Sequence, residues 1–211
     1  MNQIDWKNES AGHFEKHAEE RLQDVYPWLL RDFIEFTGWQ IAGRKILEIG
    51  CGPGFMLQQF SAGSPALLTG VDASFSMLHR VAAAARAPKA LLVQADACSL
   101  PFAEASFDAV FSRGSVFFWA DLHAAFAGIK RCLRPGGQAL IGGGYGISTP
   151  QAIIDARQNP AAKVTFHAST PDSWQKLPGR LAARPKFSRQ QSEDSGYTGN
   201  SKTPLCTQLK A

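Results

Sequence analysis

The chain has 211 residues, of which 45% are hydrophobic, and its formal net charge is +4. This length is enough for one domain with a sizeable core, and so mild a charge gives no reason to expect a nucleic-acid partner. Residues 1–7 are polar, and no stretch approaches the ~18–20 consecutive apolar residues of a membrane span. We therefore expect neither a secretory signal nor membrane association.

The four cysteines are far apart in the sequence. They are Cys51, Cys98, Cys132 and Cys206. Metal sites and redox motifs need closely spaced cysteines, so the spacing predicts free thiols and no metal site. Free thiols are typical of a reducing compartment, and we expect a cytoplasmic protein.

Residues 9–37 show helical periodicity that is interrupted at Pro27. Because proline is tolerated in the first turn of a helix but not in its interior, a second helix is expected to begin there and to end at Thr37 and Gly38. Residues 1–40 are thus predicted to be N-terminal helices. They either close over a site as a lid or simply cover the rest of the fold.

Residues 41–150 alternate between short apolar runs and amphipathic segments. Strands are predicted at 45–49, 66–71, 90–95, 109–111 and 138–141, with helices beginning near Phe55, Ser74 and Leu122. Strands that alternate with helices form right-handed βαβ units. The sequence therefore predicts an α/β fold of three layers, with a doubly wound, mostly parallel, Rossmann-like sheet.

The C-terminal segment, residues 151–211, is weakly patterned. A short helix is predicted at 151–157 and a short strand at 163–166, whereas residues 188–211 are polar and read as loop or tail. A closing antiparallel hairpin, if one exists, is either irregular and near Phe187 and Leu205 or curtailed.

The loop after the first strand, Gly50-Cys51-Gly52-Pro53-Gly54, has glycines at alternate positions. Glycine permits a tight turn and lets a ligand lie against bare backbone. The helix that follows points its unpaired N–H groups at the strand end, which favours a negatively charged group. Taken alone, the motif is equally compatible with a turn that binds nothing.

Two aspartates follow the next two strands, and the carboxyl ends of parallel strands share one edge of the sheet. Asp72 comes about 20 residues after the glycines, the offset of a carboxylate that binds ribose hydroxyls, although it could instead cap the next helix. Asp96 could accept the amine of an adenine while the Ala97 N–H pairs with a ring nitrogen, or it could only satisfy its own loop. Asp72 by itself fits NAD, FAD or an S-adenosyl ligand.

Five segments in this order resemble the motifs of class I S-adenosylmethionine-dependent methyltransferases. They are residues 46–54, 69–78, 94–102, 106–112 and 133–137. The resemblance covers about residues 40–145 and is nearest to the ubiquinone-biosynthesis-type enzymes, which act on small molecules. It implies a methyltransferase fold and S-adenosyl-L-methionine as the cofactor.

The resemblance also implies roles for individual residues. The loop glycines would border the methionine part of the cofactor, Asp72 the ribose, Asp96 and Ala97 the adenine, and Ser112 the sulfonium. Glu48 would orient the loop or meet the cofactor's ammonium through water, with a purely structural role left open. The implied cofactor-binding residues are Glu48, Gly50, Cys51, Gly52, Gly54, Asp72, Ala73, Met77, Asp96, Ala97 and Ser112.

No catalytic base is assigned. Methyl transfer from a sulfonium depends mainly on positioning, and a base is needed only when the acceptor must lose a proton. The histidines considered, each more in keeping with a surface or packing role, are His13, His17, His79 and His123. Phe117, Phe118 and Trp119 either wall the acceptor pocket, face a cation or pack in the core.

Two features of the sequence narrow the range of possible acceptors and mechanisms. An Asn-Pro-Pro-Tyr type motif is missing after the fourth predicted strand, which argues against methylation of amides or base amino groups, and no carboxylate cluster suggests a metal. The prediction is a cytoplasmic methyltransferase acting on a small molecule, as a monomer or homodimer. The alternatives are a non-catalytic S-adenosylmethionine-binding protein and a dinucleotide-dependent oxidoreductase.

Overall fold

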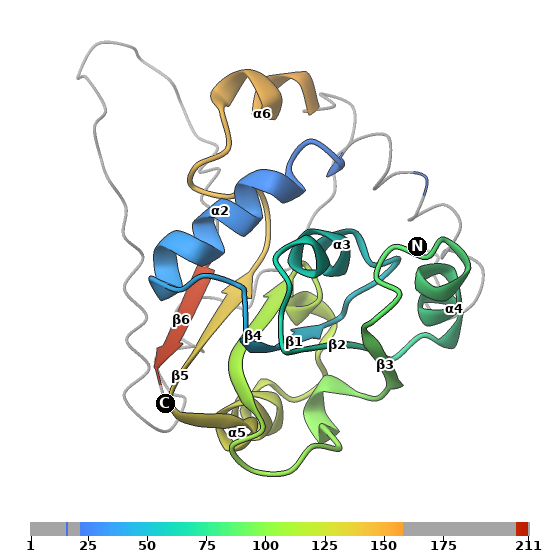
Figure 1. Ribbon diagram of the computed structural model, residues 1–211, viewed down its shortest axis with the longest axis vertical. Coiled ribbons are helices and arrows are strands. Elements are labelled where there is room, and N and C mark those ends of the chain that lie inside the picture. Colours follow the sequence, from blue (N-terminus) through green and yellow to red (C-terminus); the bar gives the residue numbers. More distant parts are fainter. Residues whose placement is uncertain (1–15, 17–21, 158–205, 211) are drawn as a thin grey trace.

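The computed structural model describes Lys16 and residues 22–157 and 206–210 (Figure 1). These residues form a sheet with the strand order β3-β2-β1-β4-β5-β6. The strands are β1 (Lys45–Ile49), β2 (Leu67–Asp72), β3 (Leu91–Gln94), β4 (Phe107–Arg113), β5 (Leu133–Gly142) and β6 (Cys206–Lys210). The helices are α2 (Tyr26–Thr37), α3 (Phe55–Ala62), α4 (Phe75–Ala83), α5 (Leu122–Cys132) and α6 (Gln151–Arg157), with 3-10 turns η1 (Ala97–Ser99) and η2 (Val116–Phe118).

Strands β1 to β5 are parallel, and β6 is antiparallel to β5. The predicted doubly wound α/β sheet is therefore confirmed. The prediction of loop or tail is wrong for residues 206–210, because backbone pairing with β5 makes this polar sequence a strand without an apolar pattern of its own. Residues 163–166 and Phe187 lie outside the described residues.

Helices α2, α3 and α4 lie on one face of the sheet and α5 on the other (Figure 1). On the first face, Phe33 of α2, Phe60 of α3 and Phe111 of β4 meet edge to face, with ring centroids 5.0 to 5.9 Å apart. Neighbouring Val110 points to the other face and packs with Ile129 of α5. Burial of such side chains contributes about 1.5–3 kcal/mol each and holds the strand ends rigidly.

Helix α2 begins and ends where the sequence predicts. Pro27 lies in its first turn, and Gly38 ends it in the left-handed conformation, with its N–H bonded to the Ile34 carbonyl. The helix buries Leu29 and Phe33 against the sheet, so this part of the N-terminal region covers the core. Residues 9–15 and 17–21 of the predicted earlier helix lie outside the described residues.

Strand β5 starts earlier than predicted. Leu133 already pairs with Phe107, and pairing resumes at Gln138 with Ala109, so residues 134–137 bulge out of the ladder. Gly136 adopts a φ of 77° there. The predicted turn thus exists, but it lies within β5.

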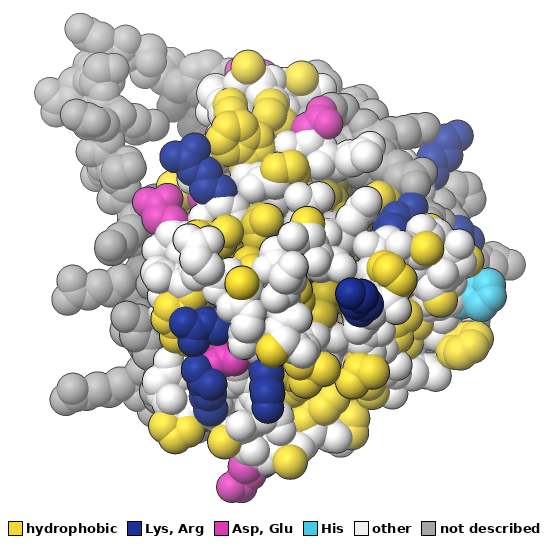
Figure 2. All heavy atoms as spheres, viewed as in Figure 1, with side chains coloured by type: hydrophobic (Ala, Val, Ile, Leu, Met, Phe, Trp, Pro, Cys, Tyr) yellow, Lys and Arg dark blue, Asp and Glu magenta, His cyan; other side chains and the backbone are white. Residues whose placement is uncertain are grey.

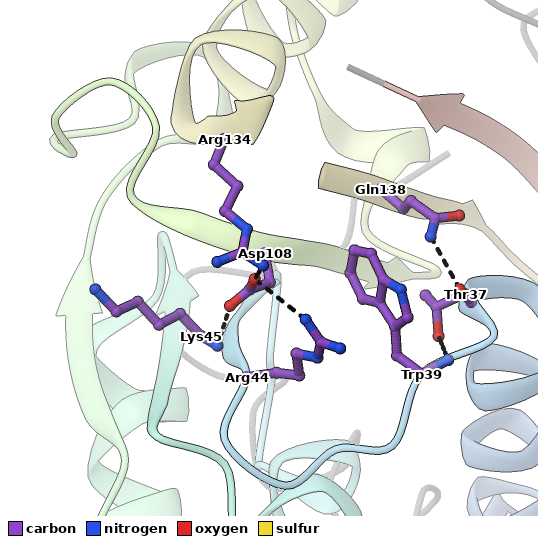
Figure 3. Close-up of polar contacts among 7 residues, drawn as sticks. All are labelled: Thr37, Trp39, Arg44, Lys45, Asp108, Arg134 and Gln138. Carbon is purple, nitrogen blue, oxygen red and sulfur yellow. Dashed lines mark hydrogen bonds and ion pairs between the residues drawn. The ribbon is translucent and has the colours of Figure 1, made fainter. Parts of the chain in front are cut away.

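Charged groups tie the strands together at the amino end of the sheet (Figure 3). Buried Asp108 at the start of β4 accepts the Lys45 backbone N–H at 2.7 Å and pairs with the guanidinium of Arg134. Arg44 approaches the same carboxylate at 3.9 Å. This end of the sheet is therefore closed by structural contacts, opposite the strand ends where a ligand is expected.

Among the described residues, no helix combines the length and apolar character that crossing a membrane requires. On the face shown in Figure 2, Lys and Arg side chains occur in small groups separated by hydrophobic and neutral ones.

Candidate cofactor site

The glycine loop folds back over the end of β2. The N–H groups of Gly50 and Cys51 both donate to the Val71 carbonyl, at 2.7 and 3.0 Å. Gly50, Gly52 and Gly54 have φ values of 69°, 51° and 87°, a region that L side chains enter only at a cost. The alternating glycines are therefore required by the backbone path of the turn itself.

Asp72 joins this loop to the next one. Its Oδ2 accepts the Gly52 N–H at 2.8 Å, and its Oδ1 accepts the Ser74 N–H at 2.9 Å. Burial raises the pKa of Asp72, while the two N–H donors oppose that rise. Each oxygen keeps a second lone pair, so the carboxylate can hold the loop and still accept two hydroxyl hydrogens.

Glu48 is 4% exposed in β1, and its Oε2 has no hydrogen-bond partner among the described residues. Burial raises the pKa of Glu48 well above its ordinary value, and the charge of Asp72 adds to this, while the Leu57 N–H opposes it. A buried oxygen without a partner costs free energy unless a donor reaches it. The position is therefore suited to an ammonium or a bridging water.

Asp96 and Ala97 lie beside the Asp72 strand end, since the Ala95 N–H donates to the Asp72 carbonyl at 3.2 Å. The Asp96 side chain caps η1 by accepting the Cys98 N–H at 2.8 Å, so the local role considered above is present. Ala97 is buried at 7% exposure. Strands β2 and β3 thus bring the two predicted aspartates to one edge.

Ser115 was missed by sequence reasoning and lies at the centre of a hydrogen-bond network. It donates to the Ile49 carbonyl at 3.1 Å and accepts the Trp119 indole N–H at 3.2 Å. The Ser112 hydroxyl lies 2.7 Å away, and since Ser115 has one hydrogen, Ser112 is its donor in this arrangement. A Cβ on Gly50 would lie 2.1 Å from the Ser115 Cβ, so serine and glycine fit together.

Arg86 is a second contact that sequence reasoning did not identify. Its Nη1 donates to the Pro53 carbonyl at 3.0 Å, and its guanidinium lies 4.3 Å from the centroid of the Phe55 ring. Arg86 therefore connects the segment after α4 to the glycine loop and to the start of α3. A lone arginine after a helix offers no sequence signal for such a role.

The remaining predicted cofactor residues differ in exposure. Met77 and Cys51 are buried at 6% and 5%, and burial raises the pKa of the Cys51 thiol well above its ordinary value. Ala73 is exposed, and its carbonyl accepts from the Gln94 amide at 3.2 Å. Ala73 is therefore available to a ligand, whereas Met77 is a buried residue of α4.

The aromatic residues after β4 divide between packing and exposure. Trp119 packs edge to face on Phe126, and the Phe117 ring lies against the backbone of Gly143. Phe118 is 58% exposed. Of the considered histidines, His79 and His123 are exposed on α4 and α5, and His13 and His17 lie outside the described residues.

Within the described ranges, no group of three or more His, Cys, Asp or Glu side chains could hold a metal ion.

Residues 47–141 match the family model described as "Methyltransferase domain". The malonyl-[acyl-carrier protein] O-methyltransferase of Legionella pneumophila is 34% identical over 139 residues, which are 62% of this chain and 48% of that protein. The O-methyltransferase resE of Aspergillus sclerotiorum is 33% identical over 162 residues, 74% of this chain and 58% of that one. The chain thus spans about half the length of these curated relatives.

A solved structure from Methanococcus maripaludis, described as a candidate S-adenosyl-L-methionine-dependent methyltransferase, superposes with a TM-score of 0.66 at 27% sequence identity. The superposition covers 74% of this chain and 71% of that one. The fold, the ordered strand-end motifs and these relatives agree. Residues 47–141 are thus similar to a methyltransferase domain, and the chain shares its fold with the Methanococcus maripaludis structure.

Proposed function

We propose that the protein transfers a methyl group from S-adenosylmethionine to an oxygen atom of a small-molecule acceptor. The main support is that hydrogen bonds connect the glycine loop with the ends of β2 and β3. Asp72 accepts the Gly52 N–H through its side chain and the Ala95 N–H through its backbone carbonyl. The O-methyltransferase names of several relatives, including the 27-O-demethylrifamycin SV methyltransferase of Amycolatopsis mediterranei, support oxygen as the acceptor atom.

The residues at these strand ends fit the cofactor. Asp72 has spare lone pairs for a ribose diol, and the unpartnered Oε2 of Glu48 suits an ammonium. Gly52, which has a φ of 51°, leaves bare backbone in the loop beside Asp72. Asp96 and Ala97 are the residues that would hold the adenine.

S-adenosylmethionine, when bound, supplies an activated methyl group that leaves a neutral thioether behind. The chain's own residues have to hold the acceptor in line and exclude water, and such positioning can lower a barrier by ~7–11 kcal/mol in favourable cases. The Ser112–Ser115–Trp119 network fixes the backbone of β4 beside the glycine loop. These residues act in positioning, and none of them acts as a base.

Asp72 provides the direct test of the cofactor site. Asp72→Asn should weaken binding of S-adenosylhomocysteine about 10- to 100-fold, the effect of losing charge-assisted hydrogen bonds. Because Asp72 also holds the Gly52 and Ser74 N–H groups, the loss should be compared for adenosine and 2′,3′-dideoxyadenosine. Isothermal titration should show a large loss for adenosine and a small one for the dideoxy compound.

Asp155→Asn removes an exposed carboxylate on α6 and serves as the control. Equal losses for both nucleosides would refute the ribose assignment and leave Asp72 a loop-holding residue only. Formation of S-adenosylhomocysteine over a panel of hydroxyl and carboxyl acceptors tests turnover. Cofactor binding without turnover across the panel would favour a non-catalytic binding protein. Binding of NADH instead of S-adenosylhomocysteine would favour an oxidoreductase.

A cytoplasmic location and a monomeric or homodimeric state belong to the same proposal. The location is supported by the free thiols of Cys51, Cys98 and Cys132.

A further inference from the structure

Arg113 is the last residue of β4, and three segments distant in sequence meet at its side chain. Its Nε donates to the Gly144 carbonyl, beyond the end of β5, at 2.9 Å. Its guanidinium also lies 5.7 Å from the centroid of the Tyr26 ring, at the start of α2. The arginine is therefore held in place by neutral groups.

The charge of Arg113 is not balanced by a carboxylate within the described residues. Arg44 and Arg134 pair with Asp108 at the other end of β4, whereas Arg113 donates to a backbone carbonyl and lies near the Tyr26 ring. A guanidinium has five N–H donors in a planar fork, so several remain for a ligand. A held, half-exposed cation with free donors is suited to a planar anion.

Tyr26 adds a neutral donor beside this cation. The residue is 8% exposed, its ring stacks on Phe55 at 5.5 Å, and burial raises the pKa of its phenol. The phenol is therefore protonated at neutral pH. The protonated phenol has one hydrogen that it can donate to a ligand bound beside Arg113.

The place of this pair in the sheet separates it from the predicted adenosine-binding positions. Across the sheet, the strand ends come in the order β3, β2, β1 and β4. The first three are followed by Asp96, Asp72 and the glycine loop. Arg113 ends β4 and hydrogen-bonds Gly144 in the loop after β5. Side chains alternate along a strand, so Arg113 lies on the α2 face with Phe111. The pair thus lies one position beyond Ser112, on the side of the glycine loop away from Asp72 and Asp96.

We propose that Arg113 and Tyr26 form a carboxylate-binding subsite for the methyl acceptor, which is therefore an anionic small molecule. This inference rests on the proposed function. The carboxylate in the amino-acid part of the cofactor is the other group that could bind to Arg113 and Tyr26. The order of strand ends across the sheet favours the acceptor.

The test uses the full chain saturated with S-adenosylhomocysteine and two pairs of probes, benzoate with benzamide and hexanoate with hexanamide. Titration followed by ligand-observed NMR should show the carboxylates binding at least about tenfold more tightly than the matched amides. Arg113→Gln should abolish this preference, and Tyr26→Phe, which keeps the ring on Phe55, should reduce it severalfold. Arg31→Gln removes an exposed guanidinium from α2, the helix that carries Tyr26, and should leave the preference for carboxylates intact.

A separate measurement distinguishes the two sources of the carboxylate. Arg113→Gln should change the affinities for S-adenosylhomocysteine and for 5′-methylthioadenosine, which lacks the amino-acid part, by less than about twofold. Loss of S-adenosylhomocysteine binding alone would overturn the proposal in favour of the cofactor's carboxylate. Equal binding of carboxylates and amides would also overturn it. Failure of the wild-type chain to bind S-adenosylhomocysteine would instead refute the proposed function.

Discussion

Glu48 carries a carboxyl group that the fold buries with one oxygen unpartnered. Its pKa is raised well above the ordinary value by burial and then by the charge of Asp72. The folded chain therefore binds this proton more tightly than the unfolded chain does. The resulting stability is present below the unfolded pKa of about 4.3 and is lost as pH rises through the folded pKa.

Glu48→Gln should remove this part of the pH dependence, because glutamine resembles the protonated side chain. Without ligand, the variant should melt at a higher temperature than wild type near about pH 8, and the difference should shrink toward about pH 5. Thermal denaturation across this range measures the effect. Glu35→Gln, an exposed change on α2, is the control, and parallel curves for wild type and Glu48→Gln would contradict the prediction.

Among the loops that connect helices and strands, two glycines with the same φ allow the cost of a left-handed backbone to be separated from the cost of a steric clash. Gly50 and Gly38 both have a φ of 69°. A Cβ on Gly38, after α2, would meet nothing within 4 Å, whereas one on Gly50 would meet the Ser115 Cβ at 2.1 Å. Both substitutions incur the left-handed penalty, and only the second also forces the loop away from β4.

Gly38→Ala should lower the free energy of unfolding by about 1–2 kcal/mol, and Gly50→Ala by a further ~1–3 kcal/mol from overpacking. Urea denaturation of the two variants gives the difference directly. Gly50→Ala should also lose S-adenosylhomocysteine binding while Gly38→Ala keeps it. Equal destabilisation would show that the loop can move away from Ser115 freely.

The same scale shows which elements their sequence specifies. Helix α2 is delimited by Pro27 and Gly38, whose effects on the backbone are local. Strand β6 carries no such signal, because its state depends on hydrogen bonds to a β5 strand more than 60 residues away. The early start of β5 likewise depends on pairing of Leu133 with Phe107, which no local pattern announces.

Over the whole molecule, Asp108 links the starts of β1 and β4 to the bulge in β5 (Figure 3). Its carboxylate is 3% exposed, whereas the side chains of Arg44 and Arg134 are 34% and 46% exposed. Removing the carboxylate leaves both arginines in reach of water but leaves the Lys45 N–H without its acceptor. The cost should therefore be smaller than that of an arginine stranded in the core.

Asp108→Ala should lower the free energy of unfolding by about 2–3 kcal/mol, and Asp108→Asn by less, since an amide oxygen can still accept from Lys45. Chemical denaturation measures both. Glu104→Ala removes an exposed carboxylate and should change stability by less than about 0.5 kcal/mol. A cost for Asp108→Ala no larger than that of Glu104→Ala would show that the cluster does not hold the sheet.

The sequence by itself determined the parallel α/β sheet, the positions of its first four strands to within a few residues, and the edge at which the glycines and aspartates meet. These follow from local chemistry, since apolar periodicity sets the elements and the βα order sets which strand ends coincide. The tertiary structure alone decided the partners of Ser115, Arg86 and Arg113, and the strand at 206–210. Each of these depends on contacts between segments far apart along the chain, and no spacing within a single segment encodes them.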